Sequence, residues 1–125
     1  MRSIFLSIIL TISLTACSDY QSPTTYYSGT IKYDDGAQYV GKLAENRGDK
    51  IRHGYGTYTY PDGEKYVGEW KWGYLTGAGT WTHPSGDKYV GEFKKHEFNG
   101  YGTYTYSDGE VLEGIWEDGE FKGKK

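Results

Sequence analysis

The chain is poor in the residues that usually build a globular core or a covalent scaffold. It contains one cysteine, three prolines and one methionine among 125 residues, and leucine and alanine are scarce after residue 16. A single cysteine excludes an intramolecular disulfide, and so few aliphatic side chains exclude a large aliphatic core. Aromatic residues make up 18% of the chain, which also has 19 glycines. The side chains that the fold buries must therefore be mainly rings.

Charge and catalytic motifs are also sparse. The formal net charge is -3, which does not indicate a nucleic-acid partner. No Gly-x-Ser-x-Gly elbow occurs, and Gly77-Ala78-Gly79 lacks the third glycine and the following helix of a dinucleotide-binding loop. His83 aligns with Tyr60 and Tyr106, which favours a packing role over metal binding. We therefore predict that the chain is not an enzyme and has no cofactor and no metal.

The first sixteen residues differ in composition from everything that follows. A basic start at Arg2 precedes an apolar run from Ile4 to Leu14, which is too short to span a bilayer and fits the hydrophobic region of a secretory signal. The sequence Leu14-Thr15-Ala16-Cys17 then resembles the lipobox of bacterial lipoproteins. An ordinary signal peptide with an incidental cysteine is the alternative interpretation.

The lipobox resemblance implies how the chain is held at the bacterial cell envelope. In that family, cleavage leaves the cysteine as the first residue and its thiol receives a diacylglyceryl group, so Cys17 is the expected lipidation site. We predict a lipoprotein signal peptide over residues 1–16 and a lipidated linker over residues 17–26, with stable membrane anchoring by several acyl chains. The resemblance also implies the outer membrane facing the periplasm. The outer face of the cytoplasmic membrane is the alternative, because Asp19 lies close to the sorting position.

Residues 54–70 predict a single β-hairpin. Strand formers fill positions 58–60 and 66–67, and Pro61-Asp62-Gly63 between them suits a three-residue loop that closes with a glycine bulge. This loop sets the register, which pairs residues of one face as follows: Tyr60 with Glu64, Tyr58 with Tyr66, Gly56 with Gly68, and Gly54 with Trp70. The hairpin therefore predicts rings that cover bare glycine backbone.

Near copies of this hairpin fill most of the chain. Aligned on the turn, the copies span residues 27–43, 54–70, 77–93 and 100–116, and their turn glycines are 27, 23 and 23 residues apart. The first interval carries four extra residues within positions 44–53, and residues 124–125 form a basic tail. A repeat of this length predicts stacked units that share one core.

The unit resembles the MORN repeat. The resemblance rests on Tyr66-Val67-Gly68-Glu69-Trp70 followed by Gly73, Gly77 and Gly79, and it covers residues 27–123. The end copies depart from the pattern, and His96 replaces an expected glycine. Choline-binding repeats share the glycine-aromatic composition, but the Tyr-Val-Gly-Glu-Trp order and the Pro-Asp-Gly turn favour MORN. The resemblance implies an all-β fold, an extended single-layer antiparallel meander of about four MORN-type β-hairpins after a cleaved signal peptide.

Stacked hairpins would place equivalent rings in columns on one face. We expect three such columns: Tyr58, Trp81 and Tyr104; Tyr66, Tyr89 and Leu112; and Trp70, Phe93 and Trp116. The opposite face carries Thr57, Lys65, Val67 and Glu69 and should be wet. Three acids recur where each hairpin leaves its turn, and they fit solvated turn acids or the lining of a ligand groove: Glu64, Asp87 and Glu110.

The MORN resemblance implies a non-catalytic protein-interaction or scaffolding module, here on a membrane-anchored lipoprotein. The alternatives are binding of membrane phospholipid headgroups by the repeats, and binding of peptidoglycan or another glycan by the aromatic face. We predict a membrane contact through the acyl groups and a protein partner, and no nucleic acid. Self-association is open to the two sheet edges, near Tyr27–Tyr33 and Ile115–Trp116.

The candidate partner-binding residues come from the end units. End units have one covering neighbour instead of two, so we expect their rings to be more exposed than those in the middle. The candidates are Tyr33, Tyr39, Tyr106, Trp116 and Phe121. The middle rings, Tyr66, Tyr89, Trp70 and Trp81, are expected to serve as core.

Overall fold

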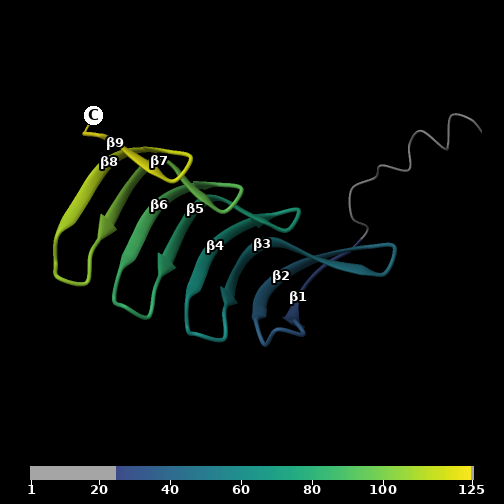
Figure 1. The fold of residues 1–125 in the computed structure, drawn as a ribbon. Coiled ribbons are helices and arrows are strands. Elements are labelled where there is room, and N and C mark those ends of the chain that lie inside the picture. The colour runs from purple at the N-terminus through teal and green to yellow at the C-terminus, as the bar shows by residue number, and fades with distance from the viewer. Residues whose placement is uncertain (1–24, 125) are drawn as a thin grey trace, which may run out of the picture.

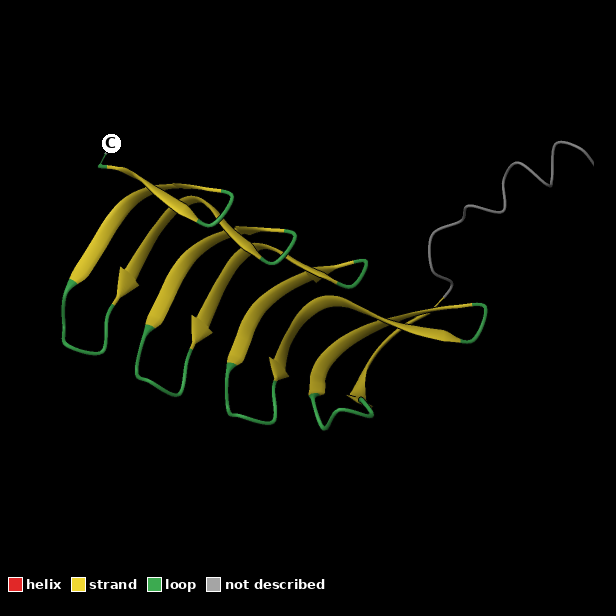
Figure 2. Ribbon diagram, in the orientation of Figure 1, coloured by secondary structure: helices red, strands yellow, loops and turns green. Residues whose placement is uncertain are grey.

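The structure is a computed structural model that describes residues 25–124. These residues form one antiparallel sheet in the order β1-β2-β3-β4-β5-β6-β7-β8-β9, each strand pairing with the next in sequence (Figure 1). The strands are β1 Thr25–Lys32, β2 Gln38–Asn46, β3 Asp49–Thr59, β4 Lys65–Lys71, β5 Tyr74–Thr82, β6 Lys88–Lys94, β7 Glu97–Thr105, β8 Val111–Glu117 and β9 Glu120–Gly123. Figure 2 shows strands and loops along this part of the chain and no helix. The all-β, single-layer meander of hairpins is confirmed.

The predicted turns lie in a line along one side of the sheet, at the ends of the strands that they join (Figure 1). In the second unit the Gly63 N–H donates to the Tyr60 carbonyl at 3.0 Å, and the Tyr60 N–H donates to the Glu64 carbonyl at 2.8 Å. Gly63 has φ of 98°, and Asp62 Oδ1 accepts the Glu64 N–H at 2.9 Å. This is the glycine-closed loop with an aspartate cap that the sequence indicates. The strand pairing is the expected one, with Tyr58 opposite Tyr66 and Gly56 opposite Gly68.

The segments between units are hairpins too, which the sequence reasoning missed. Each closes with two residues of positive φ, as Trp72 (51°) and Gly73 (86°) do between the second and third units. Positive φ at both central residues is the signature of a two-residue type I′ turn, which suits twisted strands. The four extra residues of the first interval lengthen the β2–β3 hairpin, which continues its pairing out to Asn46 and Asp49.

A row of glycines crosses the whole sheet from β1 to β8. Its members pair one with the next in the order Gly29, Gly41, Gly56, Gly68, Gly79, Gly91, Gly102 and Gly114. Neighbouring backbones leave no room for side chains along this row. A Cβ on Gly68 would lie 2.5 Å from the Ala78 carbonyl oxygen and 2.7 Å from the Gly79 Cα. The glycines therefore permit close approach of backbone to backbone, as well as of ring to backbone.

Side chains of the core lie in two rows, one on either side of the glycines. The first row runs without interruption through Ile31, Tyr39, Tyr58, Tyr66, Trp81, Tyr89, Tyr104 and Leu112. The second contains the buried rings Trp70, Phe93 and Trp116. The predicted columns thus share one face, and two of them form a single continuous row. With one layer of strands, these rings are the main buried apolar surface of the protein.

The other face is open, as expected. Threonine and valine alternate across it, from Thr57 to Val67, Thr80 and Val90, and Val90 is 45% exposed. Lys65 and Glu69 on this face are also exposed. Residues 25–124 contain no helix long and apolar enough to cross a membrane.

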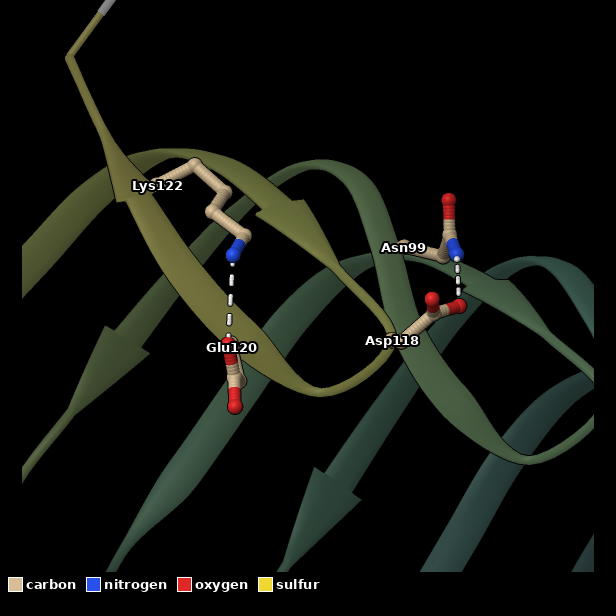
Figure 3. A network of polar contacts seen from close by, with 4 residues as sticks. All are labelled: Asn99, Asp118, Glu120 and Lys122. Carbon is tan, nitrogen blue, oxygen red and sulfur yellow. Dashed lines mark hydrogen bonds and ion pairs between the residues drawn. The ribbon is translucent and has the colours of Figure 1, made fainter.

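The two ends of the sheet differ from each other. The outer side of β1 has no strand partner among the described residues, whereas β9 covers part of β8, with Phe121 opposite Trp116. The expectation of a free edge at Ile115–Trp116 is therefore wrong. Two polar contacts involve this last hairpin. Asn99 Nδ2 on β7 donates to Asp118 Oδ1 in the turn at 3.3 Å, and within β9 Lys122 Nζ lies 3.1 Å from Glu120 Oε2 (Figure 3).

Candidate functional site

The core is organised around contacts between a tyrosine, a glycine and a tryptophan from neighbouring units. The Tyr39 ring lies directly on Gly56, where an added Cβ would be 2.6 Å from the Tyr39 Cε2 atom. Trp70 meets Tyr39 edge to face, with ring centroids 5.4 Å apart, and its indole N–H donates to the Gly56 carbonyl at 3.0 Å. The Tyr39 hydroxyl donates to the Lys42 carbonyl at 2.7 Å. Every polar atom of the two rings is thereby satisfied in a buried place.

The same arrangement recurs two units later and is absent between. Tyr89 lies on Gly102, meets Trp116 at 5.5 Å, and the Trp116 indole N–H donates to the Gly102 carbonyl at 3.1 Å. Between the first two units and the last two, Phe93 stands at the tryptophan position and has no N–H to donate. The tyrosine of that position, Tyr66, is only half-buried and meets Phe93 at 6.3 Å. The array therefore consists of two tightly packed pairs of units with a looser junction.

Arg52 interrupts the apolar pattern of the core near this junction. It pairs with Leu43, as Leu75 pairs with Trp70, Phe98 with Phe93 and Phe121 with Trp116. The other hairpins thus place leucine or phenylalanine where this one has arginine. Sequence reasoning missed Arg52. The signal that could have revealed it is its position two residues before Gly54, because Leu75 and Phe98 stand two residues before the equivalent Gly77 and Gly100.

The Arg52 guanidinium lies over aromatic faces of the core. Its Cζ atom is 4.8 Å from the Trp70 ring centroid and 5.0 Å from that of Tyr58. Arg52 Nη2 donates to the Gly73 carbonyl at 2.8 Å, and within residues 25–124 the guanidinium has no carboxylate partner. Cation–π contacts and one hydrogen bond hold the group in place. Most of its five N–H donors remain available.

A hollow of about 290 Å³ surrounds this guanidinium on the aromatic face. Its lining residues are Arg52, Tyr58, Tyr60, Tyr66, Trp70 and His96. Burial, and then the charge of Glu64, raises the pKa of both Tyr60 and Tyr66, so these phenols stay protonated. Burial, and then the charge of Arg52, lowers the pKa of His96, which is therefore uncharged at neutral pH. Arg52 supplies the only positive charge in the lining.

The five partner-binding candidates do not form one surface. Tyr39 is fully buried and Trp116 is 5% exposed, so the expectation that end rings are the more exposed is wrong for both. Tyr106 is 36% exposed, while Tyr33 and Phe121 are half-buried against the core. The error came from counting neighbouring units, because β9 covers Trp116 and the Trp70 ring meets Tyr39. Cys17 and the predicted signal peptide lie outside the described residues.

Two middle rings also differ from expectation. Tyr89 and Trp70 are buried, as expected of core, but Tyr66 and Trp81 are only half-buried. The Trp81 indole N–H donates to Glu64 Oε1 at 2.7 Å, which assigns this acid to a structural bond at the turn. Asp87 behaves similarly, because Oδ2 accepts the Tyr104 hydroxyl at 2.6 Å.

One cluster of the described residues has the donor types of a metal site. Asp62, Glu64 and His83 each place a ligand atom within 4.8 Å of the others. However, these groups already have partners within the turns: His83 Nδ1 lies 2.8 Å from the Ser85 hydroxyl, and Glu64 Oε1 accepts the Trp81 indole N–H at 2.7 Å. The cluster fits a hydrogen-bonded pair of turns better than a metal centre.

The fold and the repeated tyrosine–glycine–tryptophan contacts define an open, single-layer β-hairpin repeat protein. The MORN repeat family matches residues 49–65, 66–88 and 89–111, three consecutive segments that together make up half of the chain. The chain belongs to the MORN repeat family. Its repeats are generally protein or membrane interaction modules and are typically non-enzymatic. A search of curated proteins found no significant match.

Proposed function

We propose that the chain is a non-catalytic binding scaffold, held at the bacterial cell envelope by a lipid on Cys17, whose repeats capture a protein partner. The observation that carries the proposal is the hollow around Arg52, where a cation without a carboxylate partner in residues 25–124 replaces an apolar core residue. Exposed apolar surface with a focused charge suits recognition of another molecule. Membership of a family of interaction modules agrees with this use.

The anchor is proposed from the sequence Leu14-Thr15-Ala16-Cys17. Mass spectrometry of the mature protein from bacterial membranes should find Cys17 at its N-terminus with a diacylglyceryl group on the thiol. Cys17→Ala should leave the precursor unprocessed and unacylated. An unmodified Cys17 in the wild-type protein would remove the anchor from the proposal.

Binding of phospholipid headgroups is the second candidate, and one feature favours it. Lys65 and Lys88 lie in one row of the open face, each opposite Thr82 on the strand between them. Two strand spacings separate them by about 9.6 Å, which suits neighbouring headgroups. Glu69 and Glu92 lie on the same face and oppose an anionic surface.

Three experiments separate the candidates. Unlipidated protein that begins at Ser18 should remain at the bottom of a flotation gradient with anionic vesicles, and it should not sediment with purified sacculi. Chemical crosslinking in intact envelopes should give a discrete heavier protein species. Flotation with the vesicles would favour the headgroup function, and sedimentation with sacculi would favour glycan binding.

A further inference from the structure

We propose that the hollow around Arg52 is a binding site for a carboxylate on a short apolar stem, presented by the protein partner. This inference deepens the proposed function and rests on it. The site consists of the guanidinium, the faces of Trp70 and Tyr58 as its apolar floor, and the phenol of Tyr60 at its rim. Tyr60 is 39% exposed, so the rim is open to solvent.

An anionic ligand follows from the surroundings of the guanidinium. Among residues 25–124 its one hydrogen bond goes to the Gly73 carbonyl, and it forms no ion pair there. The rings around it keep water away from one side, which strengthens the attraction of an incoming negative charge. Tyr60 is protonated at neutral pH and adds a hydroxyl donor, whereas the Tyr66 hydroxyl already bonds to Glu64. His96 is uncharged, so it neither attracts nor repels the ligand by charge.

A carboxylate fits better than a phosphate. The planar fork of arginine can bind the oxygens of either group with two parallel hydrogen bonds, so the surrounding charges decide between them. Asp35 and Glu64 lie near enough to influence the tyrosines of the hollow, and their negative charges disfavour a ligand with two charges. The chain is itself acidic, at -3, which opposes an approach to an anionic lipid surface. A partner polypeptide can supply a single carboxylate together with an apolar stem.

A merely structural arginine would not account for this position. The equivalent residues Leu75 and Phe98 fill the same place by apolar packing, and Leu75 is fully buried. In this fold Arg52 also donates to the Gly73 carbonyl and lies over the Trp70 and Tyr58 rings, so part of its role is structural. Replacing a partly buried charge by a well-packed apolar residue is nevertheless often neutral or stabilising. One hydrogen bond leaves most donors of the guanidinium unused, and anion binding accounts for them.

The test uses small probes and the full-length lipidated protein in detergent micelles. The indole N–H signals of Trp70 and Trp116 are followed by NMR during titration with 3-phenylpropionate. The Trp70 signal should shift saturably, and the Trp116 signal, from the equivalent position two units away, should not. The neutral amide 3-phenylpropionamide and the monoanionic diester methyl phenyl phosphate are titrated in parallel. The amide should bind at least about tenfold more weakly, because it cannot accept a charge-assisted hydrogen bond, and the diester should bind no more tightly than the acid.

Arg52→Leu introduces the residue that the next unit has at this position. It should abolish the carboxylate-dependent shift and leave the thermal midpoint unchanged or higher. Arg52→Gln keeps donors without the charge, gives the same loss, and carries the test if the leucine variant does not fold. Equal binding of acid and amide, tighter binding of the diester, or full binding by the variants would each overturn the site. These results leave envelope anchoring and partner capture, which are measured separately, untouched.

Discussion

The indole of Trp70 meets the Tyr39 ring edge to face at 5.4 Å and at 81°, although the two residues belong to different units. The pair recurs as Tyr89 and Trp116, at 5.5 Å and 86°. Each pair joins two hairpins through a ring on glycine and an indole bond to that glycine's carbonyl. The packing repeat of this array is therefore two units long, and the hollow around Arg52 lies where one pair gives way to the next.

Gly56→Ala should destabilise the protein by displacing the Tyr39 ring. The added methyl would lie 2.6 Å from Tyr39 Cε2, so the ring or the strand must move. Overpacking of this kind costs about 1–3 kcal/mol. Chemical denaturation of the variant and of the wild type measures the loss directly.

Two further variants make this prediction specific. Gly48→Asn is the control, because a Cβ there meets nothing within 4 Å and asparagine tolerates the φ of 89°. Valine at Gly48 would strain that backbone and is unsuitable. In a double-mutant cycle, Gly56→Ala should cost less when Tyr39 is already leucine. An unchanged cost would show that the ring is not what the methyl displaces.

His96→Gly should stabilise the protein. His96 has φ of 72° in the turn position that glycine fills at Gly48, Gly73 and Gly119. Positive φ costs a non-glycine residue about 1–2 kcal/mol. This is more than His96 regains from its ring contacts with Trp70 and Tyr74 and from the long hydrogen bond, 3.4 Å, that its Nδ1 accepts from the Leu75 N–H. The reciprocal change Gly119→His, where φ is 82° and no atom lies within 4 Å, should lower the thermal midpoint. Opposite shifts in both variants would refute this explanation.

Alkaline pH should destabilise the fold through Tyr39 and Tyr89, the two fully buried tyrosines of the described residues. Burial raises the pKa of Tyr39 and of Tyr89 to about 12, against 10.0 for a free tyrosine. The unfolded chain therefore releases these protons first as the pH rises. Stability is fully present below pH 10 and is lost progressively between about pH 10 and 12. Thermal melts across this window should fall less steeply for Tyr39→Phe combined with Tyr89→Phe, although that variant is weaker at neutral pH.

Trp116→Ala and Tyr106→Ala should separate core from surface among the end rings. Trp116 is 5% exposed and bonded to the Gly102 carbonyl, so its loss should cost about 3–5 kcal/mol. Tyr106 is 36% exposed, and its ring centroid lies 4.7 Å from that of Tyr104. Its loss should therefore cost about 1 kcal/mol. Melts of similar midpoint for the two variants would contradict the burial described.

The hairpin register and the shared aromatic face could be predicted from the sequence. The turn Pro61-Asp62-Gly63 fixes the pairing locally, and the two-residue period of a strand then assigns every side chain to a face. The same kinds of turn and strand residues recur in each unit, so a correct prediction of one hairpin also predicts the pairing within the others.

Contacts between units were beyond the same reasoning. Tyr39 and Tyr66 occupy equivalent places in the repeat, yet of the two only Tyr39 lies on a glycine. Trp70 packs against Tyr39, whereas Tyr66 has Phe93 at the equivalent position, and the contact with Phe93 is looser. Arg52 was missed because it lies outside the aligned hairpins, in the segment over residues 44–53 between the first two units. Both depend on which unit is the neighbour, and a pattern within one unit does not contain that information.

The claim that the hollow is where a protein partner docks can be tested in living cells. A photo-crosslinking phenylalanine derivative in place of Tyr60, at the rim, should give one discrete protein adduct, with the crosslink mapped beside an acidic residue or a C-terminus. The adduct should disappear with Arg52→Leu, and the same probe at Val40 on the open face should give none. An adduct that persists with Arg52→Leu, or one formed with phospholipid alone, would contradict the account.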